Sequence, residues 1–509
     1  HYASDFNLRE HANVVYTQTI YVDKAATGSN NGTSWADAYT VISTAISAVN
    51  QPTRILIKAG QYDYDNSTKA TQIPAYDVEF IGVDGTVVIT PNQYADAGTW
   101  SANGTAYEAT FPNDIGKAFD FGVLDSNGDA FPLEAQSSIA AVQSDGGFYW
   151  DGTKVYVRLD DDRVPDSDLE LYRGQFAGGE YAGIYMRGSN YTVYCENIEL
   201  RGWRADVRTR DISGVSAGLN FYMNNCKAGK LILPYSDEAF LFDSTFVGYE
   251  PNEDMVNYDG NTGTSVQEIV EHNCVMRMTN PSWATGGSSS QCSTTHNDCK
   301  ILRINSTYAN AFGQNIADVA GADTVLIDCD SSNSQSPSQV GYYIGTGSGG
   351  NMWLYNCSST NDTTAIQVGD ANSTAFYYNL TTDGALDAGS GTITEIFDSG
   401  DAADTTVKSV FAPDAAIRIE TAIGGGYKVY YVGESEYITQ TGAYNIVIKN
   451  DNGTITQYND GTAVGSSVHT FNYSVLEIGT GTGSEAPAAL ERIVFGDLTN
   501  AQVLQLKDV

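Results

Sequence analysis

A chain of 509 residues is too long for one compact core, so several domains or one elongated repeat body with appended modules are expected. Its formal net charge is −36 with only 26 Lys and Arg, which opposes binding to the phosphate backbone of nucleic acids. No apolar run approaches the roughly 20 residues that cross a bilayer as a helix, so membrane insertion is not expected. The 51 Gly and 33 Tyr residues favour short strands and tight turns, which are typical of a mainly β protein.

The first segment, residues 19–90, predicts a strand, a helix and then a series of short strands. Ser34 is expected to cap the helix, and Asp37 completes a capping-box-like start. The apolar face of this helix would consist of Tyr39, Ile42, Ile46 and Val49. One amphipathic helix ahead of a ladder of strands is typical of a cap that closes the end of a solenoid.

Between residues 100 and 172 the sequence predicts hairpins in place of this series of short strands. Their turns are expected at Asn127-Gly128 and Asp151-Gly152. We therefore predict an antiparallel insertion over residues 100–180. Its acidic tail, RLDDDRVPDSDLE, indicates a solvated loop. Calcium is the alternative ligand there, although the acids do not alternate as in a calcium loop, and no other cofactor is predicted.

Residues 181–400 return to short apolar strands, which predict the stacked coils of a solenoid. Five of the seven cysteines end such strands, so buried thiols in stacked positions are expected rather than metal ligands. These five are Cys195, Cys226, Cys274, Cys329 and Cys357. Cys292 and Cys299 share one polar stretch, where a local disulfide and two free thiols remain equal alternatives.

The run IYVDKAATGSNNGTSWADAYTVISTAISAV followed by ILIKAGQYD resembles the beginning of right-handed parallel β-helix proteins of the pectate-lyase-like superfamily. That superfamily includes phage tailspikes and surface polysaccharide-degrading enzymes. The resemblance implies an all-β, right-handed parallel β-helix whose cap and first coils occupy residues 1–99. It also implies an extracellular or virion-surface protein, assembled as a homotrimer, with a polysaccharide or cell-surface glycan as its partner.

Residues 405–509 predict a separate antiparallel module, with tight turns at Asn452-Gly453 and Asp460-Gly461. Thr499 is expected to cap a short terminal helix. The module resembles a reduced laminin-G or concanavalin-like jelly roll. That resemblance implies glycan binding or trimer formation as its role.

Ionisable residues concentrate between Asp254 and Asp318. A solenoid stacks equivalent positions of successive coils about 4.8 Å apart, so acids distant in sequence converge. We expect one groove, with the catalytic candidates Asp259, Glu268, His296, Asp298 and Asp318. Paired carboxylates suit a glycosidase, and a lyase needs a base and a cation that neutralises a uronate. Purely structural Asp and Asn ladders at the coil corners are the alternative.

A second cluster, RGWRADVRTRD, gathers arginines in a chain that is poor in basic residues. Guanidinium groups match carboxylate or sulfate geometry, and a tryptophan can stack on a sugar ring. The substrate-binding candidates are Arg201, Trp203, Arg204, Arg208 and Arg303. Pairing of these arginines with Asp206 and Asp211 is the alternative.

Together these features predict a tailspike-like or secreted protein that binds a polysaccharide and cleaves it as a glycoside hydrolase or polysaccharide lyase. The alternative is a non-catalytic fibre or adhesin of a virion or cell surface. Release of reducing ends or of an unsaturated product from host glycans distinguishes the two.

Overall fold

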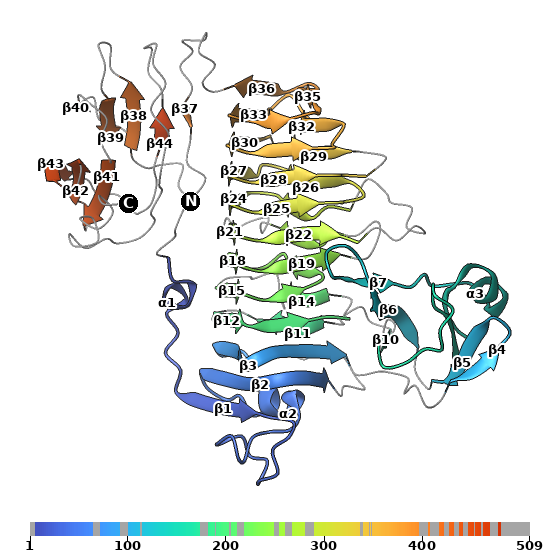
Figure 1. Ribbon diagram of the computed structural model, residues 1–509. Helices are drawn as coiled ribbons and strands as arrows, with labels where there is room; N and C mark the ends of the chain where they lie inside the picture. Colours follow the sequence, from blue (N-terminus) through green and yellow to red (C-terminus); the bar gives the residue numbers. More distant parts are fainter. Residues whose placement is uncertain are drawn as a thin grey trace. The chain divides into compact units, whose positions relative to one another are not determined.

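The computed structural model describes residues 6–395 apart from gaps at 65–71, 92–99, 112–113, 174–181, 189, 203–204, 211–217, 249–253, 260–266, 280–289, 336–338, 346 and 348, together with strands between residues 406 and 479. The larger of its two compact units contains residues 8–375 and 379–393 and is a right-handed parallel β-helix, as the sequence predicts (Figure 1). No helix of this described part is long and apolar enough to span a membrane.

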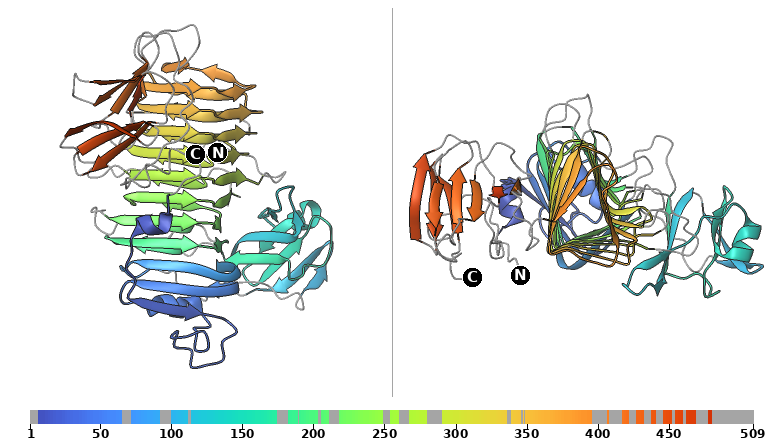
Figure 2. Two further views of the ribbon diagram at one scale, coloured as in Figure 1. Left: turned by 60° about the vertical axis from the view of Figure 1, so that its left-hand side comes forward. Right: turned by 90° about the horizontal axis from the view of Figure 1, so that it is seen from above.

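Each coil of the β-helix contributes strands to three faces, which enclose a common interior (Figure 2). Face 1 is a nine-stranded parallel sheet. Its strands are β11 (Ala182–Arg187), β14 (Ala205–Arg210), β17 (Leu231–Leu233), β20 (Val256–Asp259), β23 (Ser293–His296), β26 (Gln314–Val319), β29 (Val340–Gly345), β32 (Thr364–Val368) and β35 (Ala385–Asp387).

Faces 2 and 3 are parts of one twenty-stranded sheet. Its first strands are β1 (Gln18–Val22), β2 (Thr53–Tyr64) and β3 (Val78–Pro91). Strands β2 and β3 run across both faces, whereas β1 pairs only with the face 2 part of β2. Face 2 continues with β12 (Tyr191–Glu196), β15 (Leu219–Asn224), β18 (Glu238–Phe242), β21 (Gln267–His272), β24 (Cys299–Ile304), β27 (Asp323–Ile327), β30 (Gly350–Tyr355), β33 (Ser373–Tyr378) and β36 (Thr392–Glu395). Face 3 continues with β13 (Ile198–Leu200), β16 (Lys227–Ala228), β19 (Thr245–Gly248), β22 (Val275–Met278), β25 (Thr307–Ala309), β28 (Asp330–Ser332), β31 (Ser358–Thr360) and β34 (Thr381–Thr382).

The corner between faces 2 and 3 is a one-residue left-handed turn in coil after coil. Asn and Asp fill it because their short polar side chains tolerate positive φ better than other non-glycine residues. The turn residues are Asn197, Asn225, Asp243, Asn273, Asn305, Asp328, Asn356 and Asn379, with φ between 48° and 58°. Their side chains form a ladder: Asn225 donates to Asn197 over 2.6 Å, and Asn379 donates to Asn356 over 3.0 Å.

After six of these eight turns the next residue is a small, buried Cys or Ser, and four of the predicted cysteines occupy this position: Cys226, Cys274, Cys329 and Cys357. Cys195 is buried on β12 itself, and Cys292 and Cys299 are also buried. All seven are free thiols, so the predicted stacking is confirmed and the alternative of a Cys292–Cys299 disulfide is not formed. Burial raises the pKa of Cys226 and of Cys292 to about 12.

These seven thiols are expected to react very slowly with a maleimide in the native protein and rapidly after unfolding. Burial blocks access, and the raised pKa leaves almost no thiolate at neutral pH. Mass spectrometry of labelled protein, native and in denaturant, measures both rates. Fast labelling of Cys226 or Cys274 in the folded protein would contradict the buried stack.

Two short helices accompany the first coils: α1 (Leu8–Ala12) and α2 (Ile42–Ser47). The predicted helix exists as α2 and buries Ile42 and Ile46, but Ser34 does not cap it. Instead, the Ser34 hydroxyl accepts from the backbone N–H of Asp37 over 3.1 Å, which stabilises a turn before the helix. The expected start was too early because Tyr39 pairs with Val22 as a β-bridge.

An antiparallel insertion follows β3, with both predicted hairpins in place. Its elements are β4 (Ser101–Asn103), β5 (Ala106–Thr110), β6 (Ile115–Leu124), β7 (Ala130–Pro132), α3 (Ile139–Asp145), β8 (Gly147–Trp150), β9 (Lys154–Arg158) and β10 (Leu169–Arg173). Asp129, at the start of β7, is buried and accepts from Lys227 over 3.1 Å and from Arg277 over 2.7 Å. This carboxylate therefore anchors the insertion to β16 and β22 of face 3, which are separated by β19.

The second unit contains residues 1–7, 376–378 and 394–509, and its strands beyond residue 405 are mostly antiparallel. These strands are β37 (Thr406–Val407), β38 (Ile417–Thr421), β39 (Tyr427–Tyr431), β40 (Tyr437–Gln440), β41 (Ile446–Asp451), β42 (Thr454–Asn459), β43 (Thr462–Val468) and β44 (Glu477–Gly479). Strands β41, β42 and β43 pair antiparallel, with Asp451 opposite Thr454 and Asn459 opposite Thr462, and the two predicted turns between them lie outside the described residues. The jelly-roll resemblance stays a prediction, and the expected helix at Thr499 lies outside the described residues.

Candidate functional site

The centre of face 1 brings ionisable side chains of two neighbouring coils together. Strands β20 and β23 pair in register, with Asp259 opposite His296 and Asn257 opposite Thr294. The alternation of a strand sends Val256 and Tyr258 into the core, where both are buried. Asn257, Asp259 and His296 are half-buried on the other side of the sheet. We call Asp254, Asn257, Asp259, His296 and Asn297 the face 1 cluster.

Asp254 precedes β20 and is the most perturbed carboxyl group of the face 1 cluster. Desolvation by burial raises its pKa, and the nearby Asn257 amide and the charges of His296 and Lys230 offset this only in part. Its Oδ2 accepts from Asn257 Nδ2 over 2.8 Å. Its Oδ1 is buried and has no hydrogen-bond partner in the part of the chain that the structure describes. A carboxyl group in this setting retains a proton at a pH where ordinary aspartates have lost it.

Asn257 also connects Asp254 to the next coil, because its Nδ2 lies 3.3 Å from His296 Nε2. In the tautomer that carries its proton on Nδ1, His296 can accept a hydrogen bond from this amide through Nε2. Asp259 has a different environment, since its Oδ1 accepts from the side-chain amide of Asn297. The cluster thus combines two carboxyl groups in different environments with an imidazole.

The acidic candidates Asp298 and Glu268 are not members of the face 1 cluster. Asp298 is exposed at the corner between β23 and β24, next to the face 1 cluster. Glu268 lies on face 2, in register between Glu238 and Lys300. Burial and the charge of Glu238 raise the pKa of Glu268. The structure therefore does not place Glu268 in a common groove with Asp259 and His296.

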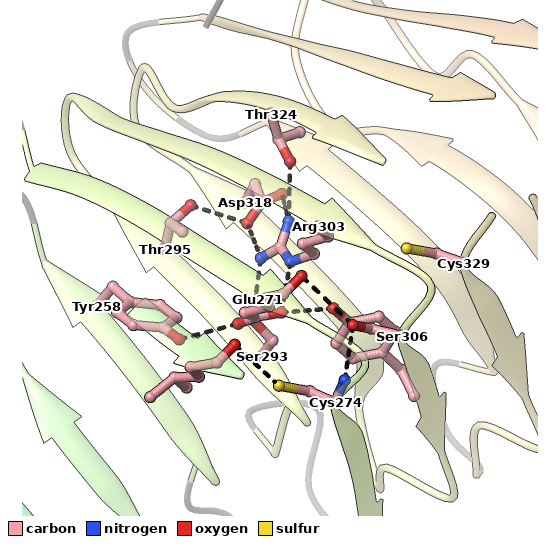
Figure 3. Close-up of polar contacts among 12 residues, drawn as sticks. Tyr258, Glu271, Cys274, Ser293, Thr295, Arg303, Ser306, Asp318, Thr324 and Cys329 are labelled. Atoms are coloured by element: carbon pink, nitrogen blue, oxygen red, sulfur yellow. Dashed lines mark hydrogen bonds and ion pairs between the residues drawn. The ribbon is translucent and has the colours of Figure 1, made fainter. Parts of the chain in front are cut away.

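Asp318 and Arg303 require a correction, because both are completely buried inside the solenoid (Figure 3). Arg303 donates through both Nη atoms to Asp318, over 2.7 and 2.9 Å, and through Nε to Glu271 over 3.1 Å. Hydroxyl groups complete the network: Thr295 donates to Asp318, and Tyr258 and Ser293 donate to Glu271. The expected catalytic and substrate-binding roles placed these two residues on the wrong side of the sheet. Their physical role is to satisfy one another in the core.

The arginines of the second cluster lie in different parts of the structure. Arg201 contacts the insertion and its own strand: it donates to Glu170 over 2.5 Å and to Glu199 over 3.0 Å, and it lies 4.2 Å from the centre of the Phe121 ring. Arg208 belongs to β14 of face 1, in register with Tyr185. Trp203 and Arg204 lie outside the described residues. Arg201 thus fixes the insertion, and Arg208 is the described candidate that lies on the sheet of the face 1 cluster.

Sequence reasoning missed Asp254 and Asn257 as functional candidates, although they bound the region it selected. The only signal was the alternation of β20, which places Asn257 and Asp259 on the same side of the strand. Metal binding finds no support among the described side chains, where no group of three or more His, Cys, Asp or Glu could hold an ion. The acidic loop proposed for calcium instead contacts arginines: Arg163 with Asp161, and Arg158 with Asp162.

No family model matches the chain, and no curated protein matches it. Solved structures do match. The complex of XylC with xylose has a TM-score of 0.41 at 9% identity and covers 72% of this chain and 69% of that one. Pectate lyase Pel9A has a TM-score of 0.37 at 11% identity, with coverage of 77% and 82%. A pectin methylesterase in complex with a hexasaccharide has a TM-score of 0.26 at 12% identity, with coverage of 74% and 93%. At these identities, what those proteins bind or act on remains a property of those proteins.

Proposed function

We propose that the protein binds a polysaccharide across the outer side of face 1 and cleaves it at the face 1 cluster. The observation that carries the proposal is the contrast between two carboxyl groups of one cluster. Burial raises the pKa of Asp254, whereas Asp259 accepts a hydrogen bond from the amide of Asn297. Two carboxyl groups with environments that differ in this way are the usual basis for assigning an acid and a base.

Asp254 is the general acid in this proposal, and its unbonded Oδ1 delivers a proton to the glycosidic oxygen as the C–O bond breaks. Asp259 acts as the base that takes a proton from the attacking water, so one water molecule is added across the cleaved bond. His296 holds Asn257, which in turn positions Asp254. The parallel strands on either side of the cluster offer a long ligand equivalent positions about 4.8 Å apart.

The test is an incubation of the full-length protein with a panel of acidic and neutral bacterial and algal polysaccharides. Hydrolysis releases reducing ends, whereas elimination also gives an unsaturated product that absorbs ultraviolet light. We expect reducing ends without this absorbance from at least one polysaccharide. Absence of both products across the panel would favour the fibre or adhesin, which binds without cleavage.

We further propose that the protein works outside the cell, on a virion tail or as a secreted protein, and that it assembles as a homotrimer. The flank of an isolated solenoid leaves a long surface for contact with other copies. Light scattering at micromolar concentration should give three times the chain mass. A monomeric mass would remove this part of the proposal without affecting the cleavage reaction.

A further inference from the structure

Strand β11, the first strand of face 1, carries two buried hydrogen-bond donors that lack acceptors in the part of the chain that the structure describes. Tyr185 on β11 is 2% exposed, and its hydroxyl has no hydrogen-bond partner in the described part of the chain. Arg187, two residues along the same side of β11, has a buried Nε in the same condition and forms no ion pair with the described residues. Arg208 lies opposite Tyr185 on β14. Three donor side chains therefore share one small area of the sheet.

The charges that act on the pKa of Tyr185 also indicate that the three side chains lie close together. Burial raises the pKa of Tyr185, and the positive charges of Arg187 and then Arg208 lower it. Elsewhere the solenoid and insertion match their arginines with acids: Arg163 pairs with Asp120 and Arg277 pairs with Asp129. Arg187 and Arg201 both have a buried Nε without an acceptor among the described residues, but Arg201 is paired with Glu170 and Glu199, whereas Arg187 has no such acidic partner there. A buried donor without an acceptor lowers the stability of the folded protein unless a bound ligand supplies the acceptor.

We infer that Tyr185, Arg187 and Arg208 form a subsite for an acidic sugar, whose carboxylate or sulfate group accepts hydrogen bonds from the three side chains. The inference rests on the proposed function, because it names the class of polysaccharide that face 1 takes. Guanidinium groups bind both planar carboxylates and tetrahedral sulfates through paired N–H donors. A tyrosine hydroxyl adds a neutral donor to the same anion.

The subsite lies at a fixed distance from the face 1 cluster. Strands β11, β14, β17 and β20 are consecutive in face 1, so β14 lies two strand spacings, about 10 Å, from β20, and β11 lies three spacings, about 14 Å, from it. Lys230, just before β17, is close enough for its charge to lower the pKa of Asp254, so positive charge continues toward the cluster. An acidic sugar held at Arg187 would thus position the polymer several sugar units away from the bond that is cleaved.

The test measures affinities of the full-length protein for labelled oligosaccharides of equal length. One carries uronate carboxylates, one carries sulfate esters and one is neutral, and a single-stranded oligonucleotide serves as a phosphate probe. The variants are Arg187→Gln and Tyr185→Phe, with Arg158→Gln in the insertion as the matched control, since Arg158 pairs with an exposed aspartate. Melting temperatures verify that each variant is folded.

We expect the wild type to prefer one acidic oligosaccharide, and the better of the uronate and sulfate probes identifies the anion. Arg187→Gln should weaken that affinity about ten- to hundredfold, Tyr185→Phe should weaken it less, and Arg158→Gln should not change it. The preference should also fall with added salt. Neutral-sugar binding should not respond to either variant.

Three outcomes would overturn the subsite: an acidic oligosaccharide that binds Arg187→Gln and the wild type equally, a neutral one that binds as tightly as the acidic ones, or a preference for the oligonucleotide. In the first two cases glycans still bind, so the proposed function survives and only the acidic subsite fails. If no glycan binds at all, the proposed function fails together with it. If Arg187→Gln does not fold, Tyr185→Phe decides by the same criteria.

Discussion

Replacement of Arg303 by Met is expected to lower the free energy of unfolding of the solenoid by about 3–5 kcal/mol, because it leaves two buried carboxylates without their counter-charge. Glu271 and Asp318 are both completely buried, and Arg303 is the cation that contacts both of them. The remaining donors to these acids are hydroxyl groups, which do not compensate negative charge. Urea unfolding followed by fluorescence measures the loss.

Two further variants separate charge from packing in this network. Asp318→Asn in the Arg303→Met background removes one uncompensated charge, so we expect it to restore part of the lost stability. Arg158→Met is the control, since its exposed ion pair with Asp162 contributes at most about 1 kcal/mol. An unchanged urea midpoint for Arg303→Met would show that the buried ion network does not stabilise the fold.

The second large effect concerns the rate of glycan cleavage. Asp254→Asn keeps the shape of the side chain and an oxygen that accepts from Asn257, but it removes the acidic proton. We expect the rate to fall about a hundredfold or more, with little change in melting temperature. Asp259→Asn should show a similar loss because it removes the base. The control is Asp162→Asn, which removes an exposed carboxylate of the insertion.

The pH dependence provides an independent check of the same assignment. The raised pKa of Asp254 means that the folded protein holds this proton more tightly than the unfolded chain does. The wild-type rate should therefore persist above the ordinary pKa of an aspartate and fall as the pH rises through the raised pKa of Asp254. The stability that the bound proton contributes is lost over the same rise in pH. A large drop in melting temperature for Asp254→Asn, with the rate unchanged, would instead indicate a structural residue.

The coil architecture could be predicted from sequence because it depends on local chemistry. Asn before Cys at the end of an apolar strand marks a left-handed corner followed by a buried position, and Asn225-Cys226 and Asn356-Cys357 follow this rule. Asn-Gly and Asp-Gly pairs likewise marked the hairpins of the insertion. Such signals act within a few residues, so one sequence is enough to detect them.

Tertiary structure alone decided which ionisable residues face the interior and which lie outside. A strand sends alternate residues to opposite sides, so an error of one residue in its register exchanges core and surface. His296 and Asp318 are both on strands of face 1, yet His296 is half-buried beside Asn257 and Asp318 is completely buried against Arg303. Both residues are ionisable, so their residue types alone do not show which of them is buried.

The face 1 cluster also depended on stacking over long separations. Asn257 and His296 are 39 residues apart in sequence and meet because β20 and β23 belong to successive coils. Tyr185 and Arg208 meet across β11 and β14 for the same reason. The sequence by itself determined that coils form and where their corners and buried thiols lie, since those features follow from local backbone and burial preferences. Only the tertiary structure determined which distant polar residues become neighbours, because the length of each connecting loop sets the register of the next coil.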